Sequence, residues 1–455
     1  MLVDKINPVL LTDCYNLCHQ AFKVNTDWEV SHIYNRNAPM ILYGLNKIIE
    51  YVFENMRITH DNAKEAERYA NEMNLWFPSE LFYSIIDDLD GYMPLMIQAI
   101  PDGNWVPRGT PFCQIRNTVV GFGECVTWWE AMLMHAWFPS VCATEAFHMR
   151  RYLDSKKLSA NRFHSFGFRG HRSLEDAYWA GTAWNLFLPG TDDFHTKKYT
   201  TAGISSIPAL AHKVVEQFDN ELECYFRAID LTAIHGKKYV SIVIDTFDTD
   251  NFIENYAEPI AKYAAVKGVK PVFRPDSGNK LEQTIAILRK CNKWNPVFII
   301  GEEMNFEKAK EYDKFLEAHN IRLQNMNYGI GGGFYNHLTR DTLGWAMKTA
   351  YSNGKNRMKF SANKQSIPGK VQVVKDHHGQ LSVFPENVNA QGYLQMYMNV
   401  YHHNKDAAAH YCITDTWSTI QKRAFGYLNI GELQTEIILS NQTKDEIDCI
   451  RKNVV

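Results

Sequence analysis

Short apolar runs alternate with longer amphipathic segments through the middle of the chain. The apolar runs end in polar residues or glycine, at 163–170, 186–193, 204–213, 239–248, 270–279, 296–303 and 321–333, and the run at 239–248 is rich in β-branched residues. Helical spacing marks the segments between the later runs, at 251–268, 280–291 and 305–320. Strands that alternate with such helices form a parallel sheet, and about seven of them favour an α/β barrel over a doubly wound sheet.

The two ends of the chain show a different pattern. Helical spacing at 42–56 and 126–138 is mixed with a β-like piece at 101–118, and the tail contains an apparent hairpin, VQVVKDHHGQLSV, at 371–383. We therefore expect the ends to join into a second, α+β domain. The predicted organisation is an N-terminal part of this domain (1–150), an α/β barrel (151–345) and a C-terminal return to the α+β domain (346–455).

Composition narrows the class of protein without identifying it. The 455 residues are 45% hydrophobic and 22% charged, which is typical of a core-forming globular chain, and the net charge of −3 provides no general attraction to nucleic acid. No apolar stretch is long enough to cross a bilayer, and we expect no signal peptide. The nine cysteines are scattered and lack a CxxC pair, so we expect reduced thiols and a cytoplasmic protein.

Polar side chains and glycines collect where the predicted strands end. These positions are His164, Phe166, Arg169, Asp192, His212, Asp245, Asp248, Arg274, Asp276, Glu302 and the GIGGG loop at 329–333. The carboxyl ends of barrel strands are where such folds build their sites. Consecutive glycine amides can cradle an anion, and arginine recognises phosphate through two parallel hydrogen bonds.

Each residue type leaves a simpler alternative open. Arg169 and Arg274 could bind phosphate or form ordinary salt bridges. The aspartates could hold Mg²⁺ through substrate phosphates or cap helices. His212 could be a base, a nucleophile or a core residue, and Phe166 and Tyr15 could stack on a flat ring or pack in a core.

Five motifs in order give the chain a family resemblance. HSFGFRG (164–170), LPGTDD (188–193), IPALAH (207–212), RPDSGN (274–279) and GIGGGFYNHLTRD (329–341) resemble those of nicotinamide phosphoribosyltransferases. The resemblance implies an irregular α/β barrel of the type II phosphoribosyltransferase kind. It also implies transfer of the phosphoribosyl group of phosphoribosyl pyrophosphate to nicotinamide, with Mg²⁺, with ATP as co-substrate, and in a homodimer whose active sites lie at the subunit interface.

The resemblance assigns roles by position. Phe166 would stack on nicotinamide, Tyr15 and Asp13 would come from the partner subunit, Asp192 would accept a hydrogen bond from the carboxamide, and His212 would be phosphorylated by ATP. The remaining positions would serve the pyridine, the ribose, the phosphates or catalysis: Arg169, Asp248, Arg274, Asp276, Gly301, Glu302, Gly331, Gly332, Arg340, Lys348, Arg36, Lys359 and Lys364.

The sequence also departs from the family pattern. Ala211 precedes His212 where the family has glutamate, which bears on the coupling to ATP, and Glu302 and Glu303 replace an acidic residue followed by glycine. Nicotinate phosphoribosyltransferase and a catalytically silent dimeric homologue remain the alternatives. A carboxylate at Asp192 favours nicotinamide over nicotinate, because it would repel the nicotinate carboxylate.

Overall fold

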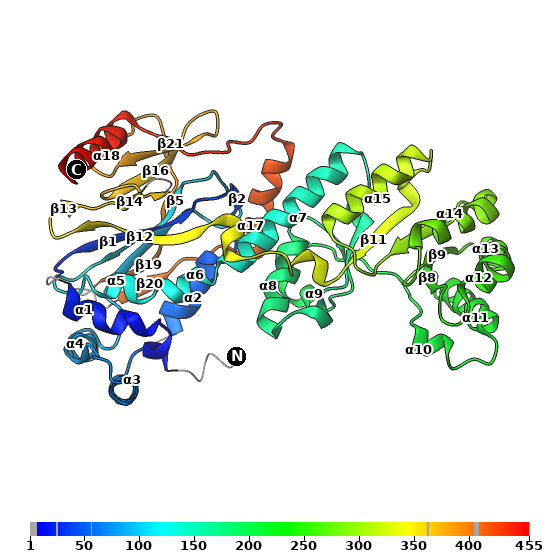
Figure 1. Cartoon of the computed structure of the whole chain (residues 1–455), viewed down its shortest axis with the longest axis horizontal. Coiled ribbons are helices and arrows are strands. Elements are labelled where there is room, and N and C mark those ends of the chain that lie inside the picture. Colours follow the sequence, from blue (N-terminus) through cyan, green and yellow to red (C-terminus); the bar gives the residue numbers. More distant parts are fainter. Residues whose placement is uncertain (1–6, 24–25, 56, 362–363, 405–408, 455) are drawn as a thin grey trace. The chain divides into compact units, whose positions relative to one another are not determined.

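The computed structural model describes residues 7–23, 26–55, 57–361, 364–404 and 409–454 (Figure 1). The chain divides into two compact units, which are treated separately below. One unit comprises residues Met1–Thr144 and Leu338–Val455, and the other comprises Glu145–His337. Helix α7 (Trp137–Ser155) runs through the boundary at Thr144. We call the first the α+β unit and the second the barrel unit.

The barrel unit is built on a six-stranded sheet in which every neighbouring pair of strands is parallel. Its spatial order is β7 (Gly190–Thr191), β6 (Phe163–Ser165), β11 (Met326–Ile330), β10 (Val297–Ile300), β9 (Lys270–Arg274) and β8 (Tyr239–Val243). The strands are short and mostly buried, as the apolar runs predict, so their carboxyl ends meet at one rim.

One segment joins the two edges of this sheet. Ser205 exchanges backbone hydrogen bonds with the β7 edge, and Leu210 and Pro208 bond to Ser241 of β8. The segment is a pair of isolated bridges and not the regular strand expected at 204–213. Pro208 has no amide hydrogen to donate, which explains the irregular pairing. The bridges nevertheless close the curled sheet into an irregular barrel, so the predicted fold class is confirmed.

Helices cover the outside of the barrel unit (Figure 1). They are α8 (Leu174–Asn185), α9 (Thr196–Tyr199), α10 (His212–Val215), α11 (Glu221–Ile234), α12 (Thr249–Asn251), α13 (Ala257–Val266), α14 (Lys280–Cys291) and α15 (Phe306–Ala318), with a π-helical turn at Phe252–Tyr256. The helical spacing predicted over 251–268 ends where the helix does, since Gly268 has φ +70° just after α13.

A buried ion pair fixes the back of the barrel. The Arg162 guanidinium donates to both carboxylate oxygens of Asp313, and the two side chains are 2% and 0% exposed. Tyr328 and Tyr152 each donate a hydrogen bond of 2.7 Å to the same carboxylate. These contacts tie the 3-10 turn Ala160–Arg162 before β6 to β11, α7 and α15, and the charges of Arg162 and Asp313 compensate each other.

The α+β unit contains a seven-stranded antiparallel sheet. Its order is β13 (Lys355–Asn356), β12 (Trp345–Ser352), β1 (Glu29–Asn35), β5 (Pro111–Asn117), β3 (Leu95–Ala99), β19 (Met398–Asn404) and β20 (Ala409–Cys412). Both chain ends contribute strands to it, and β1 from the N-terminal part pairs with β12 from the C-terminal part. The sheet therefore joins segments more than 300 residues apart.

A second, four-stranded sheet and several helices complete this unit. The sheet runs β18 (Leu394–Gln395), β16 (Val371–Lys375), β17 (Leu381–Pro385) and β21 (Ile438–Leu439). The expected hairpin is confirmed, because β16 and β17 pair in antiparallel register around the turn. The longer helices are α2 (Leu45–Asn55), α3 (His60–Glu72), α4 (Ser79–Leu89), α17 (Trp417–Gly426) and α18 (Asn441–Val454); shorter ones are α5 (Cys125–Trp128), α6 (Glu130–Met134) and α16 (Arg340–Leu343).

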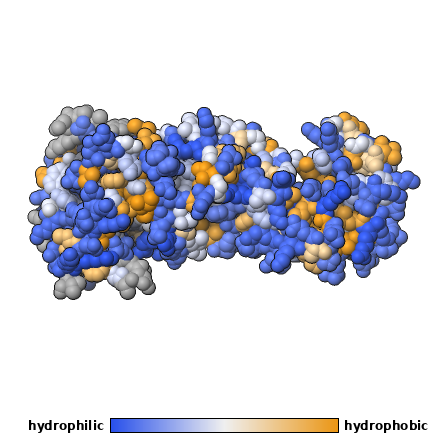
Figure 2. Space-filling view, turned by 90° about the horizontal axis from the view of Figure 1, so that it is seen from above, coloured by the Kyte–Doolittle hydropathy of each residue, from blue (hydrophilic) through white to orange (hydrophobic). Residues whose placement is uncertain are grey.

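The described helices include none that combines the length and apolar character required to cross a bilayer. The face shown in Figure 2 is largely hydrophilic, with hydrophobic side chains in small scattered patches.

Candidate active site

Phe166 lies across the carboxyl ends of two neighbouring strands. It follows β6, and its amide donates a 2.9 Å hydrogen bond to Ile330 of β11. A Cβ atom built on Gly329 would lie 2.1 Å from Phe166 Cε2, and one on Gly301 would lie 3.3 Å from it. The two glycines thus leave the space that the ring fills, and the half-buried ring provides an aromatic surface at the barrel rim.

Asp192 is linked to this ring through His164, and two donors hold its carboxylate. His164 Nε2 lies 3.0 Å from Asp192 Oδ1, and the Ser206 hydroxyl donates to the same oxygen. The His164 ring makes an edge contact with Phe166 at 5.2 Å between centroids. Burial raises the pKa of Asp192, but the hydrogen bonds from His164 and Ser206 outweigh it and lower the pKa below its usual value. Asp192 is therefore ionised at neutral pH.

The neighbouring Asp193 was not singled out from the sequence. Its carboxylate accepts hydrogen bonds from the Ser165 hydroxyl at 2.6 Å and from the Phe168 amide at 3.0 Å, and the residue is 2% exposed. These bonds shape the loop that carries Phe166. The only sequence signal was the second aspartate of GTDD.

His212 and Asp245 face each other from two other segments of the same rim. His212 opens α10, and its Nε2 lies 3.1 Å from Asp245 Oδ1, just after β8. The Ser277 hydroxyl donates to the other Asp245 oxygen. The Asp245 side chain is only 4% exposed, whereas that of His212 is 40% exposed. His212 is thus an oriented and accessible imidazole, not a core residue.

Arg274 and Asp276 form the next part of the rim. Arg274 Nη2 donates a 2.8 Å hydrogen bond to Leu210 O, and its Nε lies 3.2 Å from Asp276 Oδ2 without forming a hydrogen bond to any described residue. Burial raises the pKa of Asp276; Arg274 opposes this and Asp245 adds to it. Arg274 Nε is thus a buried donor without an acceptor, and it lies beside the Asp276 carboxylate, whose charge it compensates only in part. A polar ligand would complete this arrangement.

Three ligand atoms in this region could hold a cation. One atom each from His212, Asp245 and Asp276 lie within 4.8 Å of one another. Two carboxylates in such a cluster fit Mg²⁺, which takes one or two protein carboxylates together with substrate phosphates.

The glycine loop and the residues after β10 form a further segment of the rim. Gly332 opens a short 3-10 turn, and a Cβ on Gly333 would lie 2.1 Å from Met304 O. Gly331 passes close to the Phe166 carbonyl, with 3.5 Å to an added Cβ. Glu302 is exposed and lies 3.6 Å from the ammonium of Lys280, a buried lysine at the start of α14 that the sequence did not single out.

Two predicted residues stand apart from these contacts. Asp248 caps helix α12 by accepting a 2.9 Å hydrogen bond from the Asn251 amide, so the structure gives it the capping role that was one of its alternatives. Arg169 lies in the exposed turn Phe168–Gly170.

The predicted phosphate-binding cations outside the barrel gather in the α+β unit. Lys348 is half-buried on β12, and burial lowers its pKa; Glu130 opposes this, while Arg36, Lys359 and Arg340 lower it further. Four cations therefore lie close together, with Glu130 as an acidic neighbour of Lys348. A multivalent anion would relieve their mutual repulsion. The side chain of Lys364 lies outside the described residues.

Asp13 and Tyr15 lie at the surface of the α+β unit. Asp13 precedes the 3-10 turn Cys14–Cys18, and Tyr15 is 58% exposed, with an edge contact to His19 at 5.0 Å. Neither residue packs in a core within its unit. Both are available to a partner.

Comparisons with known proteins point to the same family as the sequence motifs. The model of the nicotinate phosphoribosyltransferase (NAPRTase) family matches residues 161–372. Two proteins named nicotinamide phosphoribosyltransferase are similar over most of their length. The one from Acinetobacter baylyi is 25% identical over 82% of this chain and 90% of its own, and the one from Xanthomonas campestris pv. campestris is 24% identical over 75% and 80%.

The fold comparison extends over almost the whole chain. The crystal structure of human nicotinic acid phosphoribosyltransferase matches with a TM-score of 0.64 and 14% sequence identity, covering 97% of this chain and all of that one. At this identity the match supports the fold alone.

Proposed function

Because the chain belongs to the nicotinate phosphoribosyltransferase family, we propose that it transfers the phosphoribosyl group of phosphoribosyl pyrophosphate to nicotinamide. The products are nicotinamide mononucleotide and pyrophosphate, which would serve NAD salvage. The observation that carries the choice of substrate is the ionised Asp192, which is linked to the Phe166 ring through the His164 imidazole. A carboxylate there accepts a hydrogen bond from a carboxamide and repels the carboxylate of nicotinate. Both bacterial relatives described above bear the corresponding name.

The same residues account for the transfer. Phe166 and Asp192 would position the pyridine nitrogen opposite the anomeric carbon of the ribose, which gains positive charge as pyrophosphate leaves. Gly331 and Gly332 would bind the 5′-phosphate through their amides, and Arg274 would complete its hydrogen bonds on the ribose-phosphate side. Asp245 and Asp276 would hold Mg²⁺, which neutralises charge on the phosphates when bound. A dedicated base is not required, because the pyridine nitrogen carries no proton to remove.

ATP coupling is proposed through His212. The contact from Nε2 to Asp245 favours a proton on Nε2 and leaves Nδ1 as the nucleophilic nitrogen. The imidazole is accessible, and Ala211 before it contributes no charge. Phosphorylation of His212 by ATP would link hydrolysis to synthesis, without being required for the transfer itself.

A homodimer is proposed to complete each site. Tyr15 is an exposed aromatic side chain that could cover the second face of a pyridine bound on Phe166 of another copy. The four cations around Lys348 would neutralise phosphates of the same ligand. This arrangement would explain why an exposed aromatic residue and a mutually repulsive group of cations lie on the α+β unit.

The deciding experiment uses the full chain with Mg²⁺ and phosphoribosyl pyrophosphate. Nicotinamide or nicotinate is added, each with and without ATP, and the mononucleotide is identified by mass. Nicotinamide mononucleotide, formed faster with ATP, is expected. Nicotinate mononucleotide as the main product would overturn the interpretation of Asp192, and no product from either substrate would contradict the proposed transfer.

A further inference from the structure

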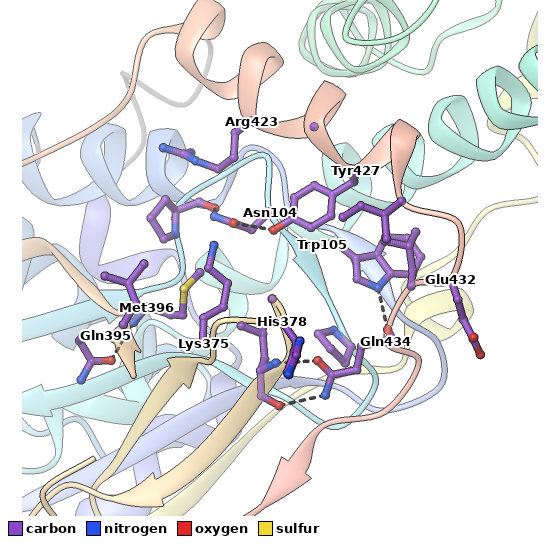
Figure 3. Close-up of a pocket in the computed structure, with 18 residues that line it drawn as sticks. Asn104, Trp105, Lys375, His378, Gln395, Met396, Arg423, Tyr427, Glu432 and Gln434 are labelled. Carbon is purple, nitrogen blue, oxygen red and sulfur yellow. Dashed lines mark hydrogen bonds between the residues drawn. The ribbon is translucent and has the colours of Figure 1, made fainter. Parts of the chain in front are cut away.

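The α+β unit contains a cavity of about 490 Å³ that none of the predicted site residues lines (Figure 3). It lies between three parts of the unit: the loops that flank β4 (Trp105–Val106), the β16–β17 hairpin, and the end of α17 with the segment that follows it. The volume is in the range of about 300–1,000 Å³ that is typical of sites for small molecules.

One wall of the cavity is aromatic and held in place. The Trp105 indole donates a 2.7 Å hydrogen bond to Gln434 O, and the Tyr427 hydroxyl donates one of 2.9 Å to Asn104. Gln434 in turn bonds to both backbone groups of Leu381, at 2.6 and 2.9 Å. With the polar tips of both rings already engaged, their apolar surfaces remain to line the cavity, together with Met396.

The cavity also contains a positive charge without a partner. Lys375 ends β16 on the same side of the strand as Val371 and Val373, which are buried, and it is itself half-buried. It forms no ion pair with any residue that the structure describes. Arg423, the other strong cation of the lining, is already bound to Asp415 at 2.9 Å and to Asp102 O.

A half-buried ammonium without a counter-ion is costly, and an anion would offset that cost. His378 lies on the hairpin turn next to Lys375 and also lines the cavity. In Figure 3, Lys375, His378, Trp105 and Tyr427 surround one space, so the charge and the aromatic surfaces can be reached by one molecule. Glu432, the acidic member of the lining, is exposed.

We propose that this cavity binds a small aromatic anion of mononucleotide size. Its ring would pack against Trp105 and Tyr427, and its phosphate would pair with Lys375, assisted by His378. A bare pyridine ring would fill only part of the volume. The inference does not depend on the proposed transfer reaction, because the lining contains none of the residues assigned to it.

The test titrates the full chain with AMP by calorimetry and repeats the titration with adenosine, which lacks the phosphate. In Lys375→Met we expect AMP to bind about 10- to 100-fold more weakly, as for loss of a charge-assisted hydrogen bond, while adenosine binding is unchanged. Lys422→Met is the matched control, since Lys422 is exposed on α17 and does not line the cavity. Lys375→Arg keeps the positive charge, so this variant should bind AMP as the wild type does. Thermal melting checks that each variant is folded.

A barrel variant separates this cavity from the proposed active site. In Asp192→Ala, AMP binding that depends on Lys375 should persist even if product formation is lost. Wild-type protein that does not bind AMP at millimolar concentration overturns the proposal. Equal AMP affinity in wild type and Lys375→Met also overturns it, and so does AMP binding that is lost in Asp192→Ala but kept in Lys375→Met.

Discussion

His164 Nε2 lies 3.0 Å from Asp192 Oδ1, although the two residues are 28 positions apart in sequence. The parallel pairing of β6 and β7 brings them together, since His164 pairs with Gly190 and Ser165 with Thr191. Asp192 thus leaves its strand where the His164 imidazole and the Ser206 hydroxyl can stabilise its charge. The barrel closure contributes directly, because Ser206 belongs to the bridging segment.

Replacing Asp192 by asparagine tests this arrangement. The amide preserves the shape but removes the charge, so we expect kcat/KM for nicotinamide to fall about 10- to 100-fold, which corresponds to about 1.5–3 kcal/mol for a hydrogen bond to a charged group. Discrimination against nicotinate should fall as well. Steady-state kinetics with both substrates measure the effect, with Asp219→Asn as an exposed control. Unchanged kinetics with nicotinamide would remove Asp192 from the site.

His212→Asn tests the proposed coupling to ATP. The variant cannot form a phosphohistidine, so stimulation by ATP should disappear while transfer without ATP remains. Labelling with γ-³²P-ATP should give an acid-labile phosphate on the wild type and none on the variant. His235→Asn replaces an exposed histidine after α11 and should behave like the wild type. Equal labelling of His212→Asn and wild type would exclude His212 as the acceptor.

Mixing two variants tests whether Tyr15 acts across subunits. Tyr15→Ala and Phe166→Ala should each be weakly active. In a mixed dimer, one site would combine an intact Phe166 with an intact Tyr15 of the partner, so random mixing should restore about a quarter of wild-type activity. The measurement is activity after the two variants are mixed and exchanged. Should Tyr15 serve its own chain, no activity would return on mixing.

The sequence predicted the barrel well because most of its strands are short, buried, apolar runs, and several of them are followed within a few residues by a helix. The sequence also indicated the rim of the barrel. Polar residues and glycines follow so many of the predicted strands that packing in a core cannot account for them. The segment 204–213 was less well predicted, because its apolar character suggested a strand while Pro208 prevents regular pairing. Whether such a segment forms a regular strand depends on its backbone hydrogen bonds, and the spacing of apolar residues gives no information about them.

Residues that act through other residues were not predictable from the sequence. Asp193, Ser206 and Ser277 contribute by hydrogen bonds to loops or carboxylates that are distant along the chain. Their residue types are common in turns, so the residue type alone does not reveal these roles before the barrel closes. Asp248 shows the opposite case, in which a conspicuous carboxylate caps a helix.

Gly329→Ala tests the space that Phe166 occupies. The new Cβ would lie 2.1 Å from Phe166 Cε2, so the ring must move or the strand must shift. Overpacking of this kind costs about 1–3 kcal/mol, and we expect KM for nicotinamide to rise together with a fall in thermal stability. Gly203→Ala is the matched control in the same unit, because nothing lies within 4 Å of its added Cβ. Wild-type KM in Gly329→Ala would show that the ring position is not needed.

Asp102, in the α+β unit, leads to a prediction about how the stability of the protein depends on pH. Its Oδ2 accepts a 2.9 Å hydrogen bond from the Gly44 amide before helix α2, its Oδ1 has no partner among the described residues, and the side chain is buried. Burial raises its pKa from 3.8 to about 7, against the opposing effect of the Gly44 bond. The folded protein therefore binds this proton more tightly than the unfolded chain does.

The resulting stabilisation is fully present below about pH 4 and is lost as the pH rises through about 7. The free energy of unfolding should fall by up to about 4 kcal/mol across this window through Asp102, at 1.36 kcal/mol per pKa unit. Asp102→Asn should flatten this dependence in urea unfolding measured at pH 5 and pH 8, whereas Asp88→Asn, an exposed control on α4, should retain it. A slope in Asp102→Asn as steep as in the wild type would assign the titration to another group, because the amide cannot bind or release the proton in question.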